Sequence, residues 1–158
     1  MSAIDQATYR QVLGHFPTGV TVIAGMDGDE PVGLAVGSFF SLSLDPALVG
    51  FCVDRSSGSW ARMADSGSFS VNVLGADQED VCRVFATSGD DKFDGIGWKP
   101  AESGSPLIDG VLAWIDCAIE DVHDGGDHEI VVGRVLGLDV ANEGSPLIFY
   151  RGGYANLK

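Results

Sequence analysis

Two long strand patterns, residues 111–122 and 129–140, constrain most strongly what this chain can fold into. They are joined by a short segment that contains Gly125-Gly126, a pair typical of a tight turn. A turn of this kind returns the chain beside itself, so the two strands are predicted to pair antiparallel. A second hairpin is predicted over residues 19–37, where the apolar period is two and Asp27-Gly28-Asp29 marks the turn.

Shorter strand patterns occur at residues 48–54, 69–74 and 146–150. Roughly six or seven strands with hairpin connections, and only three short helices, favour an antiparallel sheet closed into a barrel over alternating strand–helix units. The predicted fold class is therefore mainly β, with a few short flanking helices.

Three helices are predicted from apolar spacing and capping residues. The first places Tyr9, Val12, Leu13 and Phe16 on one face, stops at Pro17 and packs His15 at its end. The second starts at a serine cap after Arg55 and runs to about Ser66. The third is capped by Asp77, buries Val81, Val84 and Phe85, and ends at Gly89. Residues 88–106, rich in Gly and Pro, are predicted to be a long functional or mobile loop.

Length and charge limit the function classes. With 158 residues the chain is expected to form a single domain, 1–158, that keeps its own N-terminus. No apolar run approaches the roughly 18 residues of a membrane span. The net charge of -14 repels phosphate backbones and anionic head groups, so neither nucleic-acid nor membrane binding is expected. Three widely spaced cysteines show no disulfide or metal pattern, which favours a reducing cytoplasm.

Several common catalytic motifs are missing. Gly95-Ile96-Gly97 is followed by Pro100 where a dinucleotide fingerprint requires a third glycine. The chain has no P-loop, no HExxH and no GxSxG motif. His123 and His128 flank a turn without a spacing that would fix both on one ion, so no metal site is predicted. Any enzyme with this sequence must use a less conspicuous site.

Residues 54–60 offer the first candidate binding feature. Ser57 and Ser59 stand at a helix start, where hydroxyls, free backbone N–H groups and the helix dipole favour an anion, and Arg55 adds a positive charge. In so acidic a chain this spot is a natural phosphate site. The alternative is an ordinary serine N-cap.

Residues 35–43 offer the second candidate. Ser38, Ser41 and Ser43 accompany Phe39 and Phe40 at a strand end, the mixture of polar and aromatic groups that small-molecule pockets favour. The alternative is an exposed, serine-rich transition from strand to loop.

Two further features lie toward the C-terminus. His128 follows the 125–127 turn and is a candidate hydrogen-bond donor to a ligand. Tyr150 and Tyr154 flank Arg151, and this group could clamp a planar anionic ligand or a partner subunit. The alternative for the latter is a frayed tail.

Taken together, the chain resembles the flavin reductase-like family, whose fold is the FMN-binding split barrel. The resemblance runs over almost the whole sequence in the family's order of blocks: 16–22, 38–46, 69–74, Phe85-Ala86, Lys92-Phe93, 110–114, 126–133 and 150–154. It implies an antiparallel split β-barrel of Greek-key type. It also implies an NAD(P)H:flavin oxidoreductase that works as a homodimer and supplies reduced FMN or FAD to a partner monooxygenase, with NADH, or NADPH, as the reductant.

The resemblance also assigns roles by position. Thr18 and residues 35–43 would face the flavin ring and ribityl chain, Ser57 and Ser59 the phosphate, Phe85-Ala86 the flavin edge, and His128 the nicotinamide nucleotide. The full set of predicted cofactor contacts is Thr18, Ala35, Val36, Gly37, Ser38, Ser41, Ser43, Arg55, Ser57, Ser59, Trp60, Phe85, Ala86, Lys92, His128, Tyr150, Arg151 and Tyr154. Family members often carry Thr and Asn where this chain has Ala35 and Gly37.

In such a reductase the hydride passes between the two cofactors, so no catalytic side chain is predicted. Two alternatives come from other classes. One is a flavin- or haem-binding split-barrel carrier or sensor without turnover. The other is an oxidase of a phosphorylated pyridoxine-type substrate, which would need more basic residues than Arg55, Arg62 and Lys92.

Overall fold

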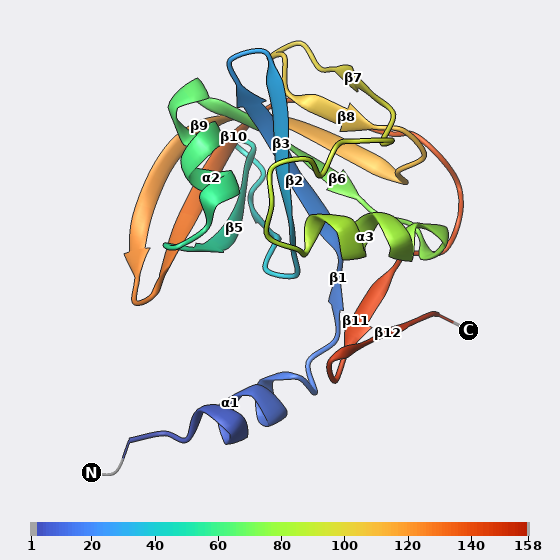
Figure 1. Cartoon of the computed structure of the whole chain (residues 1–158). Helices are drawn as coiled ribbons and strands as arrows, with labels where there is room; N and C mark the ends of the chain where they lie inside the picture. Colours follow the sequence, from blue (N-terminus) through green and yellow to red (C-terminus); the bar gives the residue numbers. More distant parts are fainter. Residues whose placement is uncertain (1–2, 158) are drawn as a thin grey trace.

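The computed structural model describes residues 3–157 and is built around one seven-stranded antiparallel sheet (Figure 1). Its order is β3-β2-β6-β9-β10-β5-β4. The strands are β2 (Thr21–Asp27), β3 (Glu30–Val36), β4 (Phe40–Ser43), β5 (Leu48–Asp54), β6 (Ser68–Val73), β9 (Ala113–Gly125) and β10 (His128–Val140).

The order of the strands shows why the sheet curls. β3 and β4 lie at opposite edges of the sheet, yet only residues 37–39 separate them in the chain. A flat sheet cannot place its two edges that close together, so the strands wrap into a barrel. Three neighbouring pairs, β2–β6, β6–β9 and β5–β10, are not consecutive in the chain, as in a Greek key and unlike a meander. The predicted antiparallel barrel is confirmed.

Two small sheets flank the barrel. One has the order β1-β11-β12, formed by β1 (Thr18–Gly19), β11 (Ile148–Tyr150) and β12 (Gly153–Ala155). The other pairs β7 (Trp98–Pro100) with β8 (Pro106–Ile108). The prediction of an irregular loop over residues 88–106 is therefore wrong at its end, and the predicted final strand is followed by another. Strands of three residues are too short to show an apolar period.

The helices are α1 (Gln6–Leu13), α2 (Gly58–Met63), which a 3-10 turn extends over Ala64–Ser66, and α3 (Glu79–Phe85). None of the helices formed by residues 3–157 has the length and apolar character needed to span a lipid bilayer. α2 begins at the predicted cap, since the Ser57 hydroxyl accepts from Trp60 N at 3.2 Å.

The prediction for α3 is wrong in its start and end and partly right in its buried face. A 3-10 turn at Ala76–Gln78 precedes it, and Gly75 N donates to Gln78 Oε1 at 3.0 Å, a closure that does not use Asp77 as the cap. α3 ends at Phe85, before Gly89. Phe85 is buried and Val81 packs against the core as predicted, whereas Val84 is exposed and Cys82 is buried in its place.

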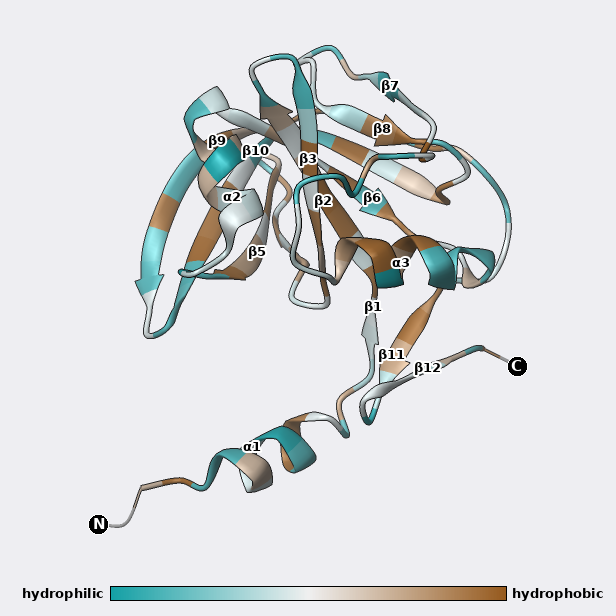
Figure 2. Ribbon diagram, in the orientation of Figure 1, coloured by the Kyte–Doolittle hydropathy of each residue, from teal (hydrophilic) through white to brown (hydrophobic). Residues whose placement is uncertain are grey.

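The core consists of two apolar clusters on the two faces of β2. Ile23 belongs to the cluster with Phe51, Phe69 and Trp60, and Val22 and Ala24 belong to the cluster that contains Phe85. Figure 2 shows the hydrophobic colouring along β2 that this double burial requires. Phe51 packs edge-to-face against Trp60 and Phe69, with ring centroids 5.6 and 5.0 Å apart.

The two ends of the chain form a separate feature, which we call the arm: residues 4–19 and 148–155. Figure 1 shows α1 and the β11–β12 hairpin extending away from the barrel. Arg151 N donates to Gly14 O at 2.9 Å, which ties the hairpin to the end of α1. α1 ends at Leu13, with Gly14 as C-cap, so the predicted stop at Pro17 is too late. No residue of α1 is buried, and the predicted apolar face is exposed.

His15 is also placed differently from its prediction. It lies beyond the end of α1 and is exposed, and its Nδ1 is 2.8 Å from Gln11 O. Its ring meets Tyr150 edge-on, with centroids 6.4 Å apart. The contact therefore joins the two halves of the arm and does not bury His15 against the barrel.

Candidate functional site

A trough runs along the C-terminal end of β3. Two hollows share Ala35, Val36 and Gly37, one of about 420 Å³ and one of about 160 Å³. The larger continues over Ser38, Cys52, Asp54, Ser57 and His128, and the smaller over Val20, Cys82, Ala86, Phe149 and Tyr154. We call the two hollows together the β3 trough. The larger hollow alone falls within the usual size range of small-molecule sites, about 300–1,000 Å³.

Many of the predicted cofactor contacts meet here, although they come from distant parts of the sequence. Those that line the β3 trough are Ala35, Val36, Gly37, Ser38, Ser57, Ala86, His128 and Tyr154. Thr18 lies against Gly37, because a Cβ on Gly37 would stand 2.8 Å from Thr18 Oγ1. Thr18 lines a neighbouring hollow of about 330 Å³ that also includes Gly37.

Ser38 has a structural task at the edge of the trough. Its hydroxyl donates to Cys52 O at 2.7 Å and accepts from Cys52 N at 2.9 Å. These two bonds join the chain after β3 to β5 across the mouth of the barrel. Ser41 and Ser43 lie elsewhere, since they pair with Val49 and Leu48 at the other end of β5 from the trough.

The start of α2 differs from the predicted phosphate cradle. Ser57 faces the trough, but Arg55 turns toward the tip of the β9–β10 hairpin. Arg55 Nε donates to Gly126 O at 2.9 Å, and its Nη2 lies 2.5 Å from Asp124 Oδ1. The positive charge of Arg55, predicted to help bind a phosphate beside Ser57, is therefore paired with Asp124 of the β9–β10 hairpin.

Asp54 brings negative charge to the same rim. Its Oδ1 accepts from Ser56 N at 2.8 Å and from the Ser56 hydroxyl at 2.7 Å. These two hydrogen bonds, with a smaller contribution from nearby His128, hold the pKa of Asp54 below its ordinary value. The carboxylate therefore stays ionised at neutral pH.

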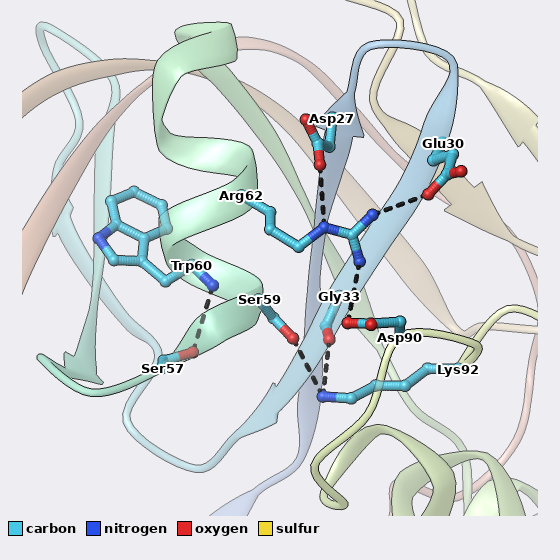
Figure 3. A network of polar contacts seen from close by, with 9 residues as sticks. All are labelled: Asp27, Glu30, Gly33, Ser57, Ser59, Trp60, Arg62, Asp90 and Lys92. Atoms are coloured by element: carbon cyan, nitrogen blue, oxygen red, sulfur yellow. Dashed lines mark hydrogen bonds and ion pairs between the residues drawn. The ribbon is translucent and has the colours of Figure 1, made fainter.

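Lys92 is buried, and its ammonium group lies beside Ser59 and Gly33 (Figure 3). Its Nζ donates to Ser59 Oγ and Gly33 O, both at 3.1 Å, and to Phe85 O at 3.3 Å. Burial lowers the pKa of its ammonium group. Only 8% of Lys92 is exposed, so it could act on a bound ligand through Ser59 but could not contact the ligand directly.

Two other predicted contacts also point into the core. Trp60 is 5% exposed and packs against Phe51, and Phe85 is 1% exposed and packs against Phe93 at 4.9 Å between ring centroids. Their aromatic character reflects core packing, so toward a ligand each could present backbone atoms only.

His128 is the first residue of β10 and pairs with Asp54 of β5. Its Nδ1 lies 2.8 Å from Asp127 Oδ1; since a carboxylate only accepts, Nδ1 donates and Nε2 is left for another partner. The side chain is 43% exposed. It also lines a second hollow, of about 680 Å³, that opens toward Tyr9 and Arg10 of α1.

The three predicted C-terminal residues are separated by the β11–β12 hairpin. Tyr154 lines the trough, and its hydroxyl lies 3.3 Å from Cys82 Sγ. Tyr150 and Arg151 lie at the far end of the arm, where Arg151 has a positive φ of 51° in the turn. The cation over the Tyr154 ring is Arg83, at 4.8 Å, so Arg151 does not stand between the two tyrosine rings. The pairing of β11 with β12 shows that residues 148–155 are not a frayed tail.

The described part of the chain contains no group of three or more His, Cys, Asp or Glu side chains arranged to hold a metal ion. The barrel, the trough of small residues along an edge strand and the histidine at its rim define a small ligand-binding β-barrel.

Comparisons with known proteins place this barrel in a family. The model described as "Flavin reductase like domain" matches residues 13–158. A flavin reductase of Pseudomonas putida is 51% identical over 157 residues, covering 99% of this chain and 92% of that protein. HsaB, the reductase subunit of a flavin-dependent monooxygenase of Rhodococcus jostii, is 49% identical, covering 99% and 80%.

Solved structures agree. Nitrilotriacetate monooxygenase component B from Mycobacterium thermoresistibile superposes with a TM-score of 0.95 at 50% identity, covering 98% of this chain and 87% of that chain. The NADH:FAD oxidoreductase SgcE6 of Streptomyces globisporus, in complex with NAD and FAD fragments, gives 0.92 at 37% identity, covering 100% and 98%. The chain belongs to the flavin reductase-like family, which confirms the resemblance and the enzyme class predicted from the sequence.

Proposed function

We propose that this protein is an NADH:flavin oxidoreductase that binds FAD or FMN in the β3 trough and releases reduced flavin to a partner monooxygenase. The observation that carries the proposal is the trough itself, in which family-predicted contacts from β3, α2, β10 and the arm converge. As part of this proposal, residues 1–158 form a single flavin reductase-like domain.

The lining of the trough fits a flavin ring. Ala35 carries only a methyl group and Gly37 has no side chain, so a flat ring can approach the backbone closely. β3 is an edge strand, and half of its N–H and C=O groups therefore face away from β2. These groups match the acceptor and donor atoms along the edge of an isoalloxazine. Backbone groups thus take over the binding that Thr and Asn side chains often provide in this family.

The two ends of the trough suit different parts of the ligands. The Ser57 oxygen accepts a hydrogen bond from Trp60 N, and this bond does not use the hydroxyl hydrogen. The Ser57 hydroxyl can therefore donate to the flavin phosphate. His128 offers Nε2 to a nicotinamide nucleotide from the wider hollow beside α1. Tyr154 closes the opposite end over Ala86.

A bound flavin supplies the chemistry of hydride acceptance, and the chain supplies orientation. Ala35–Gly37 would hold the ring at the edge of the barrel, and His128 would align the nucleotide. Val20, Ala86 and Phe149 place apolar groups at one end of the trough, where a bound ring would exclude water from them. No side chain needs to act as a nucleophile or base. NADH is the proposed reductant, and the relative from Streptomyces globisporus is named an NADH-dependent FAD reductase.

The arm supports a homodimer as the working form. Val12 is 61% exposed and Phe16 73% exposed in the N-terminal segment, and leaving such apolar side chains in water is unfavourable. We propose that a second copy of this chain packs against these side chains. The proposed location of the dimer is the cytoplasm, together with the partner monooxygenase.

A substitution that fills the trough tests the proposed site. Ala35→Leu places a larger side chain in the hollow that the flavin ring would occupy, and it should weaken FAD and FMN binding about 100-fold or more. Ala47→Leu, in the exposed loop before β5, is the matched control and should bind flavin as the wild type does. Fluorescence titration of flavin-free protein measures both. Unchanged affinity in Ala35→Leu would exclude the trough as the flavin site.

A further inference from the structure

Lys92 joins three elements of the fold at one buried point. Its ammonium group donates to a carbonyl of β3 at Gly33 and to a hydroxyl of α2 at Ser59 (Figure 3). It also donates to the carbonyl at the end of α3 at Phe85. The distances are 3.1, 3.1 and 3.3 Å, so all three N–H groups of the ammonium find an acceptor.

The surroundings of Lys92 are unusual because its partners are neutral. None of the ion pairs formed among residues 3–157 includes it, although the chain as a whole is strongly acidic. A buried cation without a carboxylate loses its hydration and regains only hydrogen bonds, which is a poor exchange for stability. Fold stability alone therefore does not account for a lysine at this position.

The three acceptors lie directly beside the residues that form the β3 trough. Gly33 precedes the lining segment of β3, Phe85 precedes Ala86, and Ser59 belongs to the helix that Ser57 caps. Phe85 also presses on β3, since a Cβ on Gly33 would stand 2.9 Å from its ring. One ammonium group thus fixes the spacing of the walls between which a flavin would lie.

We propose that Lys92 is a positioning residue for flavin, which holds β3, α2 and the end of α3 at the separation that the ring requires without touching the ring. This inference rests on the proposed function. It differs from the sequence prediction, in which Lys92 contacts the cofactor directly.

Arg62, on α2, provides a matched control because it also bonds the segment that carries Lys92. It ties Asp90 to the β2–β3 hairpin from outside, at 2.9 Å to Asp27, 2.8 Å to Glu30 and 3.5 Å to Asp90 (Figure 3). Both cations restrain residues 86–97. Lys92 bonds Gly33 and Phe85, each of which is next to a residue that lines the trough, whereas no partner of Arg62 adjoins such a residue. Loss of Arg62 loosens the segment and leaves the walls of the trough joined.

The test compares Lys92→Met, Lys92→Arg and Arg62→Gln with the wild type. Affinities for FMN and riboflavin are measured by fluorescence titration, KM for flavin and kcat by NADH oxidation, and Tm by thermal melting. Lys92→Met should weaken FMN and riboflavin by the same factor, about tenfold, and raise KM with kcat within about twofold. Lys92→Arg keeps the charge and should recover part of the loss. Arg62→Gln should lower Tm at nearly unchanged flavin affinity.

Each other result contradicts the inference. A loss confined to FMN would mean that Lys92 acts only on the phosphate through Ser59. Equal losses in Lys92→Met and Arg62→Gln would make Lys92 one structural tie among several. If the wild type binds neither flavin, the proposed function itself fails; if it binds both and Lys92→Met binds them equally well, only the role of Lys92 fails.

Discussion

The barrel and the arm differ in how their apolar side chains are covered. In the barrel, Phe51, Phe69 and Val71 are fully buried by residues of the same chain. In the arm, Val12 and Phe16 are more than half exposed, and the arm is tied to itself by the Arg151–Gly14 bond and the β1–β11 pairing. The barrel is thus stabilised within one chain, whereas the arm leaves apolar side chains exposed that the proposed homodimer would cover. The proposed flavin trough lies between them, with Tyr154 of the arm closing one end.

The largest expected contrast comes from removing one phenylalanine from each region. Phe69→Ala leaves a cavity beside Phe51 and Gly133 and should lower the free energy of unfolding by about 3–5 kcal/mol. Phe16→Ala removes a side chain that is already in water and should change it by less than about 0.5 kcal/mol. Urea denaturation at low protein concentration measures both. Similar losses would show that the arm belongs to the same cooperative core.

His128 sharpens the comparison, because it stands on the barrel but faces the first turn of α1 across the wider hollow. His128→Ala should raise KM for NADH twofold to tenfold, the loss of one hydrogen bond of about 0.5–1.5 kcal/mol, and leave flavin affinity unchanged. His123→Ala, an exposed histidine of the same hairpin, is the control and should leave KM unchanged. Steady-state kinetics decide, and an unchanged KM in His128→Ala would remove this residue from the nucleotide site.

Val12→Asp tests the arm as a subunit interface. A charge placed in the apolar face should convert a dimer into monomers in sedimentation velocity, while the unfolding free energy of the barrel changes by less than about 0.5 kcal/mol. Gln11→Asp adds the same charge beside that face and should remain dimeric. A dimer that persists in Val12→Asp would place the interface elsewhere.

The smallest expected effect is confined to high pH. A hydrogen bond with Cys82, aided by burial, raises the pKa of Tyr154 from 10.0 to about 12. The raised value means that the contact of the arm with α3 is fully present below pH 10 and is lost as pH rises toward about 12. The tyrosinate absorbance of Tyr154 should appear only in that window. Tyr154→Phe should lack this late step and keep the absorbance change of Tyr9 and Tyr150, and a wild type that lacks the late step would show that the contact is absent.

Most of the barrel could be predicted because its strands have clear signals. The period of two in β2 and β3, the Asp27-Gly28-Asp29 turn and the run 48–54 all appear as predicted, since both local turn chemistry and burial act on those residues. β7 and β12 could not be found in this way. They are short and are held by pairing with β8 and β11, which is a property of the folded chain and not of their own sequence.

Part of the lining of the candidate site could be predicted, but the positions and partners of the other predicted residues could not. Ser57 carries the signal of a helix cap, and the structure places it at the trough. The partners of Arg55 and Lys92 are far along the chain: Arg55 bonds Asp124, and Lys92 bonds Gly33. A single sequence gives no sign of such long-range partners. The sequence also does not show that the side chains of Trp60 and Phe85 are buried in the core, where they cannot contact a ligand.

The most direct test of the proposed function is NADH oxidation by protein that has first been stripped of any bound flavin. We expect almost no oxidation without flavin, and rapid oxidation, in step with flavin reduction under anaerobic conditions, once FAD or FMN is added. Oxidation at the same rate with and without added flavin, or none in either case, would show that this protein is not a flavin reductase.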